Sequence, residues 1–535
     1  MNSFFDLCLV LDPDNFFSWH KKLLLKVLDE NNVTVSVILI SENINSTKNK
    51  HFFLKCKDKI FFLYKKIDSK IFKTHLQVDK KSSFRGLLND TKVYRSNLKE
   101  LSNFFTNNGK LNNTCAILNL TYFKLDNNII DNLKYGIWEY NIGHNLNSNP
   151  NLNGIVEVLD KINLTPAYLM ASISTSNKKK KIYESHSSTD KRSISRNLNS
   201  IYVKASSFPS RVLKILKEDK NYISNCISLE ENEISKNLSF LRFLFLIARH
   251  YLKYIKDKII DIFYINQWSL LYYDGNDRLL DQLEKYKKII PPIDRFYADP
   301  FVIEKKGTKY IFIEEAKFKN MIGFISVIKI NKEGEISTPT PILKKDYHLS
   351  YPFIFEDNND YYLIPESAEN NKISLYKCVS FPYEWDFVSH IGEDIKAYDS
   401  TLLKYNNKFW LFTNVVEEKG ASSWDELHIY YSDDLHSENW LPHKKNPVIS
   451  NARSARPAGR IFFYKDKFIR PSQNCSERYG YGLGFNEILT LNEYDYNEKK
   501  IKSIIPCWNK NIIGIHTVNS IDNFTIADAI IKSKK

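Results

Sequence analysis

The stretch DPFVIEKKGTKYIFIEE, from Asp299 to Glu315, decides the fold, because its pattern returns along the rest of the chain. It holds an apolar run, a polar turn and a second run rich in aromatic and β-branched residues, a pattern typical of a β-hairpin. Further copies begin roughly every 50–60 residues, and they read YPFIFEDNNDYYLIPES from Tyr351, DSTLLKYNNKFWLFTN from Asp399, RPAGRIFFYKDKFIRPSQ from Arg456 and HTVNSIDNFTIADA from His516. Four or five such units indicate a β-propeller, whose first strands line a central channel. We predict a five-bladed propeller over residues 265–535.

Bulk composition limits the remaining possibilities. The 535 residues exceed one ordinary core, so two or three domains are expected. The net charge of +14 reflects either a coding bias towards lysine or anionic partners. No helix-turn-helix, zinc-finger or RNA-recognition motif is present, and we expect no nucleic-acid partner. Seven scattered cysteines, an N-terminus without a basic leader and no apolar run of spanning length predict a cytoplasmic protein.

The first 216 residues show a different pattern. FFDLCLVL (Phe4–Leu11) and VTVSVILI (Val33–Ile40) are strand candidates, and Phe16–Glu30 carries apolar residues at helical spacing. A strand, a helix and a strand in this order predict a right-handed βαβ unit and a parallel sheet. CAILNL (Cys115–Leu120) is a further buried strand. We therefore predict an α/β domain over residues 1–216.

Two basic segments follow the predicted strands. Residues 175–200 form a polar insert with a run of four lysines, and we predict a solvated loop there. Residues 217–264 read as a linker with a strongly apolar helix at its end, residues 236–263. Basic residues interrupt this helix at Arg242, Arg249, Lys253, Lys256 and Lys258. Such a helix either lies on an anionic membrane surface or docks the two domains together.

The segment Cys115–Leu216 resembles the fold of methionyl-tRNA and amino-sugar formyltransferases through AILNL, KYGIWEYNIGHN, LTPAYLMASIS and YVKASSFPSRVLKIL. That family uses an Asn, a His and an Asp to polarise the formyl donor and to move a proton. Laid on this chain, the Asn and His positions fall on Glu139 and Asn141, and no acidic residue lies within 172–177. Asparagine cannot act as a general base, so we predict that formyl transfer is lost. His144 reads as a loop histidine.

The aligned hairpins place polar residues at two levels of the predicted channel. The openings of the first strands present Asp299, Tyr351, Asp399, Arg456 and His516. The ends of the second strands present Glu314 or Glu315, Glu366, Asn414 and Gln473. Carboxylates, amides, an arginine and aromatic rings suit sugar recognition, because hydroxyl groups need paired donors and acceptors and pyranose faces stack on rings.

Asp299, within RFYADPFV, resembles the Ala-Asp-Pro motif of five-bladed propeller glycosidases of the arabinanase, xylosidase and invertase type. In that family the Asp is a general base or nucleophile, a second Asp tunes acidity and a Glu is the acid. The resemblance implies the last two roles for Asp399 and Glu366, a pair of carboxyls in different environments. The alternative is that these residues make turns or blade-closing hydrogen bonds.

A second resemblance is to the propeller at the N-terminus of glucosamine inositolphosphorylceramide transferases. It is carried by FYADPFV, HLSYPFIFEDNNDYYLIPES, YDSTLLKYNNKFWLFTN and ARPAGRIFFYKDKFIRPSQNCSERYGYGLGFNEI (Ala455–Ile488). Bacterial proteins join a similar propeller to a formyltransferase-like domain in this order. In the plant proteins, glycosyl transfer is attributed to a separate C-terminal domain.

The last of these segments holds a dense polar cluster of Arg456, Arg470, Gln473, Arg478 and Tyr479. Arginine suits phosphate or carboxylate, so an anionic sugar or a glycosyl phosphate is a reasonable ligand. Alternatively, these arginines clamp neighbouring blades through backbone carbonyls. Trp410, Trp424 and Trp440 are predicted to pack within blades. No phosphate-binding loop, dinucleotide motif or His-Glu-x-x-His sequence occurs, and we predict neither a cofactor nor a metal.

These patterns predict a carbohydrate-active protein of surface polysaccharide or glycolipid metabolism, acting by glycosyl transfer or glycoside cleavage. Asp299, Glu366 and Asp399 are the expected catalytic residues. The expected substrate contacts are Tyr351, Arg456, Arg470, Gln473, Arg478, Tyr479 and His516. A sugar, glycosyl phosphate or nucleotide sugar is the expected partner, in the cytoplasm or at the inner membrane surface. The alternative is a non-catalytic glycan-binding or assembly scaffold, and an amino-sugar formyltransferase is the least favoured.

Overall fold

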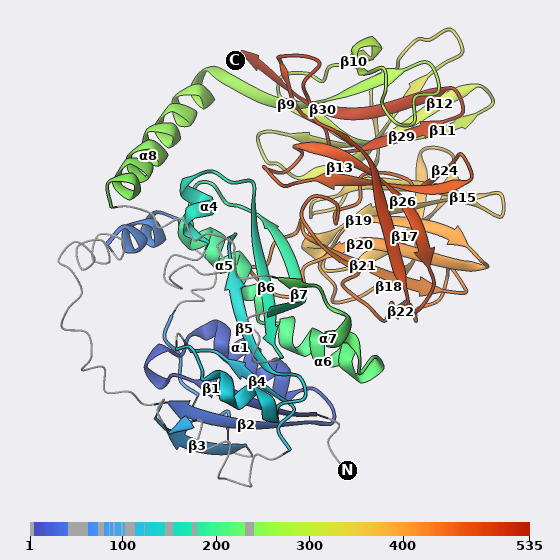
Figure 1. Cartoon of the computed structure of the whole chain (residues 1–535). Helices are drawn as coiled ribbons and strands as arrows, with labels where there is room; N and C mark the ends of the chain where they lie inside the picture. The colour runs from blue at the N-terminus through green and yellow to red at the C-terminus, as the bar shows by residue number, and fades with distance from the viewer. Residues whose placement is uncertain are drawn as a thin grey trace. The chain divides into compact units, whose positions relative to one another are not determined.

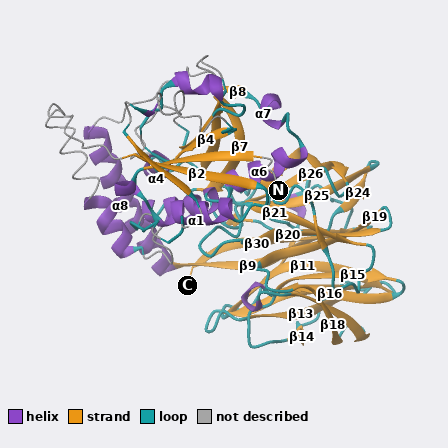
Figure 2. Cartoon of the chain, turned by 90° about the horizontal axis from the view of Figure 1, so that it is seen from below, coloured by secondary structure: helices purple, strands orange, loops and turns teal. Residues whose placement is uncertain are grey.

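The structure, a computed structural model, describes most of the chain. The described residues are 5–40, 63–72, 80–84, 86–88, 91–97, 100–101, 113–121, 123–144, 154–173, 179–229 and 240–534. Most of the segment aligned with the family's Asp, residues 174–177, lies outside them. The chain divides into a first unit, Met1–Tyr254 with Glu418–Ala421, and a second unit, Ile255–Glu417 with Ser422–Lys535. Figure 2 shows helices among the strands of the first unit, whereas the second is built almost wholly of strands.

An eight-stranded sheet forms the centre of the first unit within its described residues, in the order β3-β2-β1-β4-β5-β6-β7-β8 (Figure 1). Its strands are β1 (Phe5–Leu11), β2 (Val33–Ile40), β3 (Lys92–Ser96), β4 (Ala116–Asn119), β5 (Ile137–Ile142), β6 (Leu164–Ser172), β7 (Lys179–Ser188) and β8 (Ser228–Leu229). The predicted βαβ unit is confirmed, because α1 (Ser18–Leu28) connects β1 to its parallel neighbour β2.

The sheet is mixed, so the prediction of a parallel sheet is wrong for its second half. Strands β3, β2, β1, β4 and β5 are parallel, but β6, β7 and β8 add antiparallel pairings. A parallel connection needs a long crossover, and the short segment between β6 and β7 allows only a hairpin. The formyltransferase-like fold stays a prediction.

Alternate residues of β1 supply two apolar cores on opposite faces of the sheet. Phe5, Leu7 and Leu9 pack against the helices α1, α5 (Ile194–Ala205) and α6 (Phe208–Glu218). Cys8 and Val10 pack on the other face. Because both faces are covered, the strands read as nearly continuous apolar runs. Further helices of this unit include η1 (Pro13–Asn15), η2 (Asn127–Asn132), α4 (Ile155–Leu159), α7 (Tyr222–Asn225) and most of α8 (Phe240–Phe263), and residues 63–71 are also helical.

The lysine-rich insert is a strand, so the prediction of a solvated loop is wrong from residue 179 onward. Its lysines extend β7, which pairs with β6 along its length and with β8 at its start. Lys179 lies 2.9 Å from Glu139 and Lys181 lies 2.7 Å from Glu184. Strand pairing and these acidic neighbours allow a run of like charges to sit in a sheet.

The second unit is a five-bladed propeller, as the sequence predicted. Four blades follow one another along the described chain. They are β11 (Arg295–Lys305), β12 (Thr308–Lys317), β13 (Gly323–Ile330) and β14 (Thr340–Leu343); β15 (Ser350–Asp357), β16 (Asp360–Glu366), β17 (Ile373–Ser380) and β18 (Glu384–Gly392); β19 (Ala397–Tyr405), β20 (Lys408–Val415), β21 (Glu426–Ser432), β22 (Leu441–Pro442) and β23 (Ile449–Ser450); and β24 (Phe462–Tyr464), β25 (Lys467–Asn474), β26 (Gly482–Leu491) and β27 (Tyr496–Ile504).

The fifth blade closes the ring by joining the two ends of the propeller. It combines β9 (Tyr264–Tyr273) and β10 (Lys287–Ile289) with β28 (Ile512–Gly514), β29 (Val518–Ile521) and β30 (Phe524–Lys534). Strand β30 pairs antiparallel with β9 from Thr525 to Lys534. This pairing leaves neither end as a free edge. The short 3-10 helices η4 (Leu283–Lys285) and η5 (Ala368–Asn370) lie in connections.

The repeated phrase has one backbone cause. Strands β11, β15 and β19 each contain a bulge, and the residues within it, Asp299, Tyr351 and Asp399, have φ angles of 51°, 42° and 53°. Positive φ is uncommon for residues other than glycine and persists where the surroundings enforce it. A bulge re-aims the side chain that it carries. The same distortion therefore recurs in three successive blades.

Candidate functional site

The second strand of each blade carries a polar side chain at the matching position, buried or nearly so. These residues are Glu314, Glu366, Asn414, Gln473 and Asp528, from β12, β16, β20, β25 and β30. The choice between Glu314 and Glu315 is resolved by their contacts. Glu314 lies 3.2 Å from His348, whereas Glu315 binds Arg295 at 2.7 Å and accepts a hydrogen bond from Ser326 at 2.8 Å.

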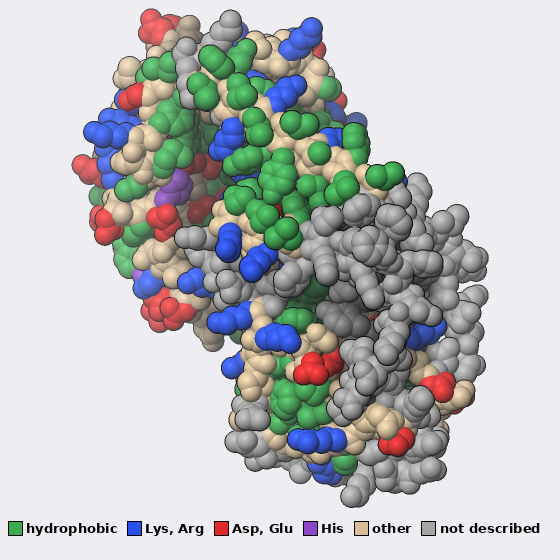
Figure 3. All heavy atoms as spheres, turned by 90° about the vertical axis from the view of Figure 1, so that its left-hand side faces the viewer, with side chains coloured by type: hydrophobic (Ala, Val, Ile, Leu, Met, Phe, Trp, Pro, Cys, Tyr) green, Lys and Arg blue, Asp and Glu red, His purple; other side chains and the backbone are tan. Residues whose placement is uncertain are grey.

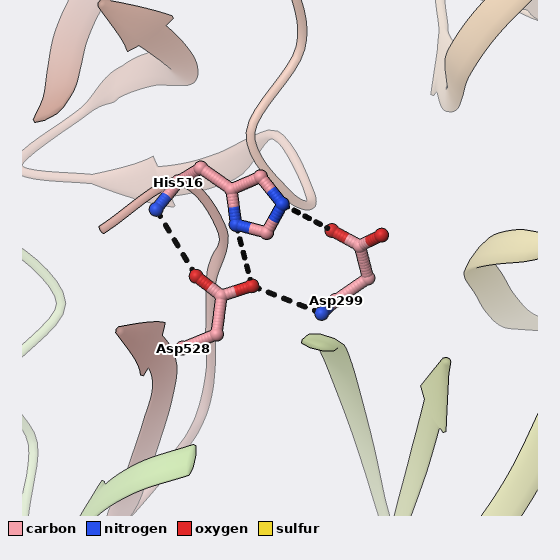
Figure 4. Close-up of side chains that lie close together, drawn as sticks. All are labelled: Asp299, His516 and Asp528. Atoms are coloured by element: carbon pink, nitrogen blue, oxygen red, sulfur yellow. Dashed lines mark hydrogen bonds and ion pairs between the residues drawn. The ribbon is translucent and has the colours of Figure 1, made fainter. Parts of the chain in front are cut away.

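His516 lies between two carboxylates (Figure 4). Its Nδ1 is 2.6 Å from Asp528 Oδ2, and its Nε2 is 3.4 Å from Asp299 Oδ1. Asp528 also accepts hydrogen bonds from the backbone N–H groups of Asp299, His516 and Thr517, at 2.9, 3.0 and 3.0 Å. All three side chains of the cluster are almost wholly buried. The cluster joins β11 to both strands of the closing hairpin.

The electrostatics of this cluster favour a protonated imidazole. Burial alone lowers the pKa of His516, but Asp528 and Asp299 outweigh it and raise the pKa to about 9. Burial raises the pKa of Asp299 well above its ordinary value, and the His516 charge opposes that rise. The three side chains bring possible metal ligand atoms within 4.8 Å of one another. Both ring nitrogens face carboxylates, however, and a protonated imidazole cannot ligate a metal. A proton on His516 and a metal cation bound by this cluster would therefore exclude each other.

Asp399 is fixed by Arg456 and Gln473 from the fourth blade. Arg456 Nε and Nη2 donate to its two oxygens at 2.5 and 3.2 Å, and Gln473 Nε2 donates to Oδ2 at 2.6 Å. Arg456 Nη1 also donates to the Ser423 carbonyl at 3.2 Å. The Asp399 side chain is only 1% exposed. Since the fork of Arg456 is already occupied by a carboxylate, Arg456 positions Asp399 and has little charge left for an external anion.

Glu366 is the acidic residue of the predicted trio that retains some exposure, at 10% of its side chain. Its Oε2 accepts a hydrogen bond from Ser350 at 3.0 Å and lies 3.8 Å from Arg456 Nη2. Burial and the Asp399 charge raise its pKa to about 7, against the opposing charges of Arg456 and His348. Glu366 Oε2 and Asp399 Oδ1 lie 3.8 and 3.2 Å from the same guanidinium nitrogen, Arg456 Nη2, so the two carboxyls are close neighbours.

Tyr351 and Tyr479 connect the two clusters. The Tyr351 N–H donates to Asp299 at 3.3 Å, and its hydroxyl lies 2.8 Å from the Thr401 hydroxyl. The Gly459 N–H donates to the same hydroxyl at 2.6 Å, and a Cβ at 459 would fall 2.0 Å from the Val518 carbonyl oxygen. Glycine is therefore required there. The Tyr479 ring is edge-on to His516 at 5.2 Å and faces the Arg456 guanidinium at 5.0 Å.

Partly exposed aromatic rings surround these clusters. Trp268 stacks on His516 with ring centroids 4.0 Å apart, and Trp424 lies 6.1 Å from Tyr479. The Tyr398 ring faces Arg456 at 5.1 Å. Trp410 and Trp440 are buried in the apolar cores between blades, whereas Trp424 is half-buried beside the site. Rings with a buried edge and an accessible face suit the apolar face of a sugar.

Two of the predicted arginines lie apart from the carboxylates. Arg470 is 1% exposed, donates twice to Glu498 at 2.8 Å and also donates to the Ser454 carbonyl at 2.6 Å. These contacts fit the alternative that it clamps its blade. Arg478 has a half-exposed side chain that donates to the Ile513 carbonyl. Of the two, Arg478 can still meet a ligand.

The alignment of the fourth copy was displaced by one residue. Glu314 pairs with Ala298, Glu366 with Ser350 and Asn414 with Tyr398. Gln473 donates its N–H to the Arg456 carbonyl, so Arg456 occupies the place of Tyr398 and precedes the position of Asp399. The looser sequence of this copy hid the register: Pro457 and Ala458 still pair with Ser472 and Pro471, and the backbone departs from the strand at Gly459, whose φ is 130°.

Four contributors to the site were missed by sequence reasoning: Asp528, Thr517, His348 and Trp268. Asp528 could have been found, since it lies in the second strand of the fifth hairpin as Glu366 and Gln473 lie in the second strands of theirs. Thr517 donates to Asp299 at 2.7 Å and directly follows His516. His348 and Trp268 lie outside the repeated phrases, and no sequence signal marks them.

The polar pair of the first unit is simpler. His144 Nδ1 lies 3.2 Å from Glu157 Oε1, and the His144 N–H donates to the same oxygen at 2.8 Å. The His144 side chain is 50% exposed. Glu139 and Asn141 hold other partners: Glu139 pairs with Lys179, and Asn141 donates to the Gly143 carbonyl at 3.4 Å. None of these contacts assembles an Asn, His and Asp trio within the described residues.

Comparison with known proteins places the similarity in the propeller. Residues 290–520 match the family described as glucosamine inositolphosphorylceramide transferase 1, N-terminal. The chain is 34% identical over 209 residues to glucosamine inositolphosphorylceramide transferase 1 of Arabidopsis thaliana, covering 38% of this chain and 27% of that protein. It is 33% identical over 206 residues to the protein of the same name from Oryza sativa subsp. japonica, with the same coverage. The chain thus spans about a quarter of the length of these relatives.

Solved structures with similarity include two glycoside hydrolases. Zg3597, a family 117 glycoside hydrolase produced by Zobellia galactanivorans, is 12% identical, covers 50% of this chain and 90% of its own, and has a TM-score of 0.33. The Cellvibrio cellulosa alpha-L-arabinanase complexed with arabinohexaose is 13% identical, covers 38% and 77%, and has a TM-score of 0.29.

Proposed function

We propose that this chain is a carbohydrate-active protein whose propeller channel binds a sugar and promotes cleavage or transfer at a glycosidic or glycosyl-phosphate bond. The observation that carries the proposal is Glu366, a partly exposed acid whose pKa is raised to about 7 beside the Asp399–Arg456 pair. A carboxyl with this pKa holds a proton near neutral pH and can release it, as a general acid must. The relatives named for glucosamine inositolphosphorylceramide transfer make an amino sugar or a glycolipid headgroup a reasonable substrate class.

The residues would divide the work as follows. Glu366 donates its proton to the leaving oxygen as the bond between that oxygen and the sugar carbon breaks. The oxygen of the attacking hydroxyl, from water or an acceptor, forms the new bond to the sugar carbon, and Asp299 accepts its proton; the neighbouring His516 charge favours the ionised form of Asp299 that this role needs. Asp399 and Arg456 position the acid and set its charge. Trp268, Trp424 and Tyr479 would hold the sugar ring, and Arg478 would meet a phosphate.

Turnover assays on Glu366→Gln test this directly. The purified chain would be incubated with uridine-diphosphate sugars, including glucosamine and N-acetylglucosamine donors, and separately with nitrophenyl glycosides. The variant keeps the shape of Glu366 but has no proton to give, so turnover should fall by about 100-fold or more. Glu393→Gln is the control, since Glu393 forms an exposed pair with Lys372 at 2.9 Å. Unchanged turnover in Glu366→Gln removes Glu366 from the mechanism.

A second candidate is a non-catalytic glycan-binding or assembly module. The observation that favours it is the closure of Asp299 and Asp399, whose side chains are 3% and 1% exposed and already accept several hydrogen bonds. This reading predicts sugar binding without turnover in the wild-type chain. Binding by saturation-transfer NMR with glucosamine and N-acetylglucosamine, measured alongside the turnover assays, separates the two.

The proposal includes a location in the cytoplasm or at the inner membrane surface. It also includes the loss of formyl transfer from the first unit. Asn141 stands where the family has its histidine, and an amide has no titratable proton near neutral pH with which to act as a general acid or base. Formyl transfer from formyl-tetrahydrofolate to glucosamine by the purified chain would contradict this part alone.

A further inference from the structure

Helix α8 packs on the first unit through one of its faces. Leu246 and His250 are 2% and 3% exposed. Leu246 belongs to an apolar cluster with residues of α4 and α5, and His250 Nε2 lies 3.1 Å from the Arg192 carbonyl oxygen. Arg242 and Arg249 both lie near Asp160, at 3.3 and 3.6 Å. One side of this helix is therefore held by protein.

The other face of α8 exposes a continuous apolar stripe. Its residues recur at intervals of three or four and fall within a sector of about 100° around the helix axis. They are Leu241, Leu244, Phe245, Leu252, Ile255, Ile259, Ile262 and Phe263, with exposures of 78, 37, 64, 68, 54, 51, 64 and 63%. Contiguous exposed apolar surface of this kind marks an interaction site. Figure 3 shows these hydrophobic side chains gathered over α8, with Lys and Arg among them.

Exposed basic side chains border the stripe on both sides. At helical spacing, Arg249, Lys253 and Lys256 follow one edge and Lys258 lies near the other. Long basic side chains can keep their charges at the level of lipid headgroups while the apolar stripe enters the acyl boundary. No helix in the described part of the chain is both long enough and apolar enough to span a membrane. The features of α8 thus match a helix that lies along a surface.

We propose that α8 binds an anionic lipid surface through this stripe, with the flanking lysines on the headgroups. Each basic residue near an anionic leaflet adds to the attraction. A second copy of the chain is the less favoured occupant, because two stripes packed together would bring their rows of positive charge side by side. The proposal goes beyond the proposed function and does not depend on it.

Vesicle flotation of the full chain tests the proposal. The chain should float with vesicles of phosphatidylcholine mixed with phosphatidylglycerol and much less with phosphatidylcholine alone. The double substitution Leu252→Gln/Ile259→Gln should reduce the bound fraction at least tenfold, since it removes apolar contact without touching the packed face. Lys253→Glu/Lys256→Glu should lose several-fold in binding and most of the preference for the anionic vesicles.

The control variants make the same types of substitution at exposed positions outside α8. Leu489→Gln removes a leucine that is 51% exposed on the propeller, and Lys500→Glu reverses an exposed charge on β27; both should float like the wild type. Unchanged thermal unfolding of the α8 variants shows that they fold. Equal flotation of wild type and stripe variant overturns the proposal. So does a wild-type chain that sediments as a dimer, becomes a monomer on stripe substitution and never floats.

Discussion

Each unit of this chain sets a histidine against a buried carboxylate, but the two sites are built differently. In the first unit, His144 is half exposed and meets Glu157 from a nearby segment. In the propeller, His516 is 1% exposed and lies between Asp299 and Asp528. Trp268 covers one face of its ring at 4.0 Å, and Tyr479 meets it edge-on at 5.2 Å.

The difference shows what convergence of distant segments adds to a local pair. Water can solvate His144 if its partner is lost, so that pair has little influence on either group. Water cannot solvate the buried His516, so its charge is determined by the two carboxylates that the closing blade and the first blade supply. The propeller channel is therefore the place where altered side chains should have large effects.

The largest effect is expected for Arg456→Met. It leaves the buried Asp399 without its bidentate partner and removes a compensating charge from Glu366. Breaking a buried ion pair from one side costs about 3–5 kcal/mol. Chemical denaturation followed by tryptophan fluorescence should show the propeller transition at a much lower denaturant concentration. Arg453→Met, at an exposed neighbouring site, should change it by less than about 0.5 kcal/mol.

Matched substitutions of the two histidines test whether the buried site contributes more to stability than the exposed pair. His516→Gln should destabilise the propeller by about 3 kcal/mol, because two buried carboxylates lose the charge between them. His144→Gln should cost less than about 1 kcal/mol, since the His144 side chain is half exposed and the backbone N–H of residue 144 still donates to Glu157. Both values come from denaturant titrations at neutral pH. Equal losses in the free energy of unfolding for the two variants would show that the convergence of segments around His516 contributes no extra stability.

A smaller effect is expected from pH. A group with a raised folded-state pKa stabilises the protein fully below its unfolded pKa and loses that contribution as pH rises through the folded value. For Glu366 this loss spans 4.5 to about 7. For His516, and for His348 beside Glu314, it spans 6.5 to about 9. Stability should therefore fall in two steps of a few kcal/mol, and the second should be the larger because two histidines contribute to it.

Variants assign the two steps. Glu366→Gln should abolish the step near pH 7 and leave the step near pH 9. His348→Gln should weaken only the second step, and adding His516→Gln should remove it. Stability that rises with pH across this range would contradict the charge arrangement of the channel.

Sequence pattern was sufficient for the propeller, because each hairpin repeats the same alternation of apolar and polar residues. The repeated pattern also predicted that Asp299, Glu366, Asp399 and Gln473 lie near one another in the propeller. It was insufficient wherever register or distant contacts decide the outcome. The irregular fourth copy concealed that the Arg456 guanidinium binds Asp399. Charge alone made β7 look like a loop, because the acidic neighbours of its lysines come from β5 and from its own strand.

The most direct test of the account is the titration of the Glu366 carboxyl itself. Carbon-13 NMR of the chain labelled at its glutamate carboxyls, with Glu366→Gln as the subtraction spectrum, isolates this one signal. The structure predicts a midpoint at about pH 7, raised by burial and by Asp399. A midpoint near the ordinary value of 4.5 would show an ionised, solvated carboxylate, and Glu366 could then not be the proton donor of this channel.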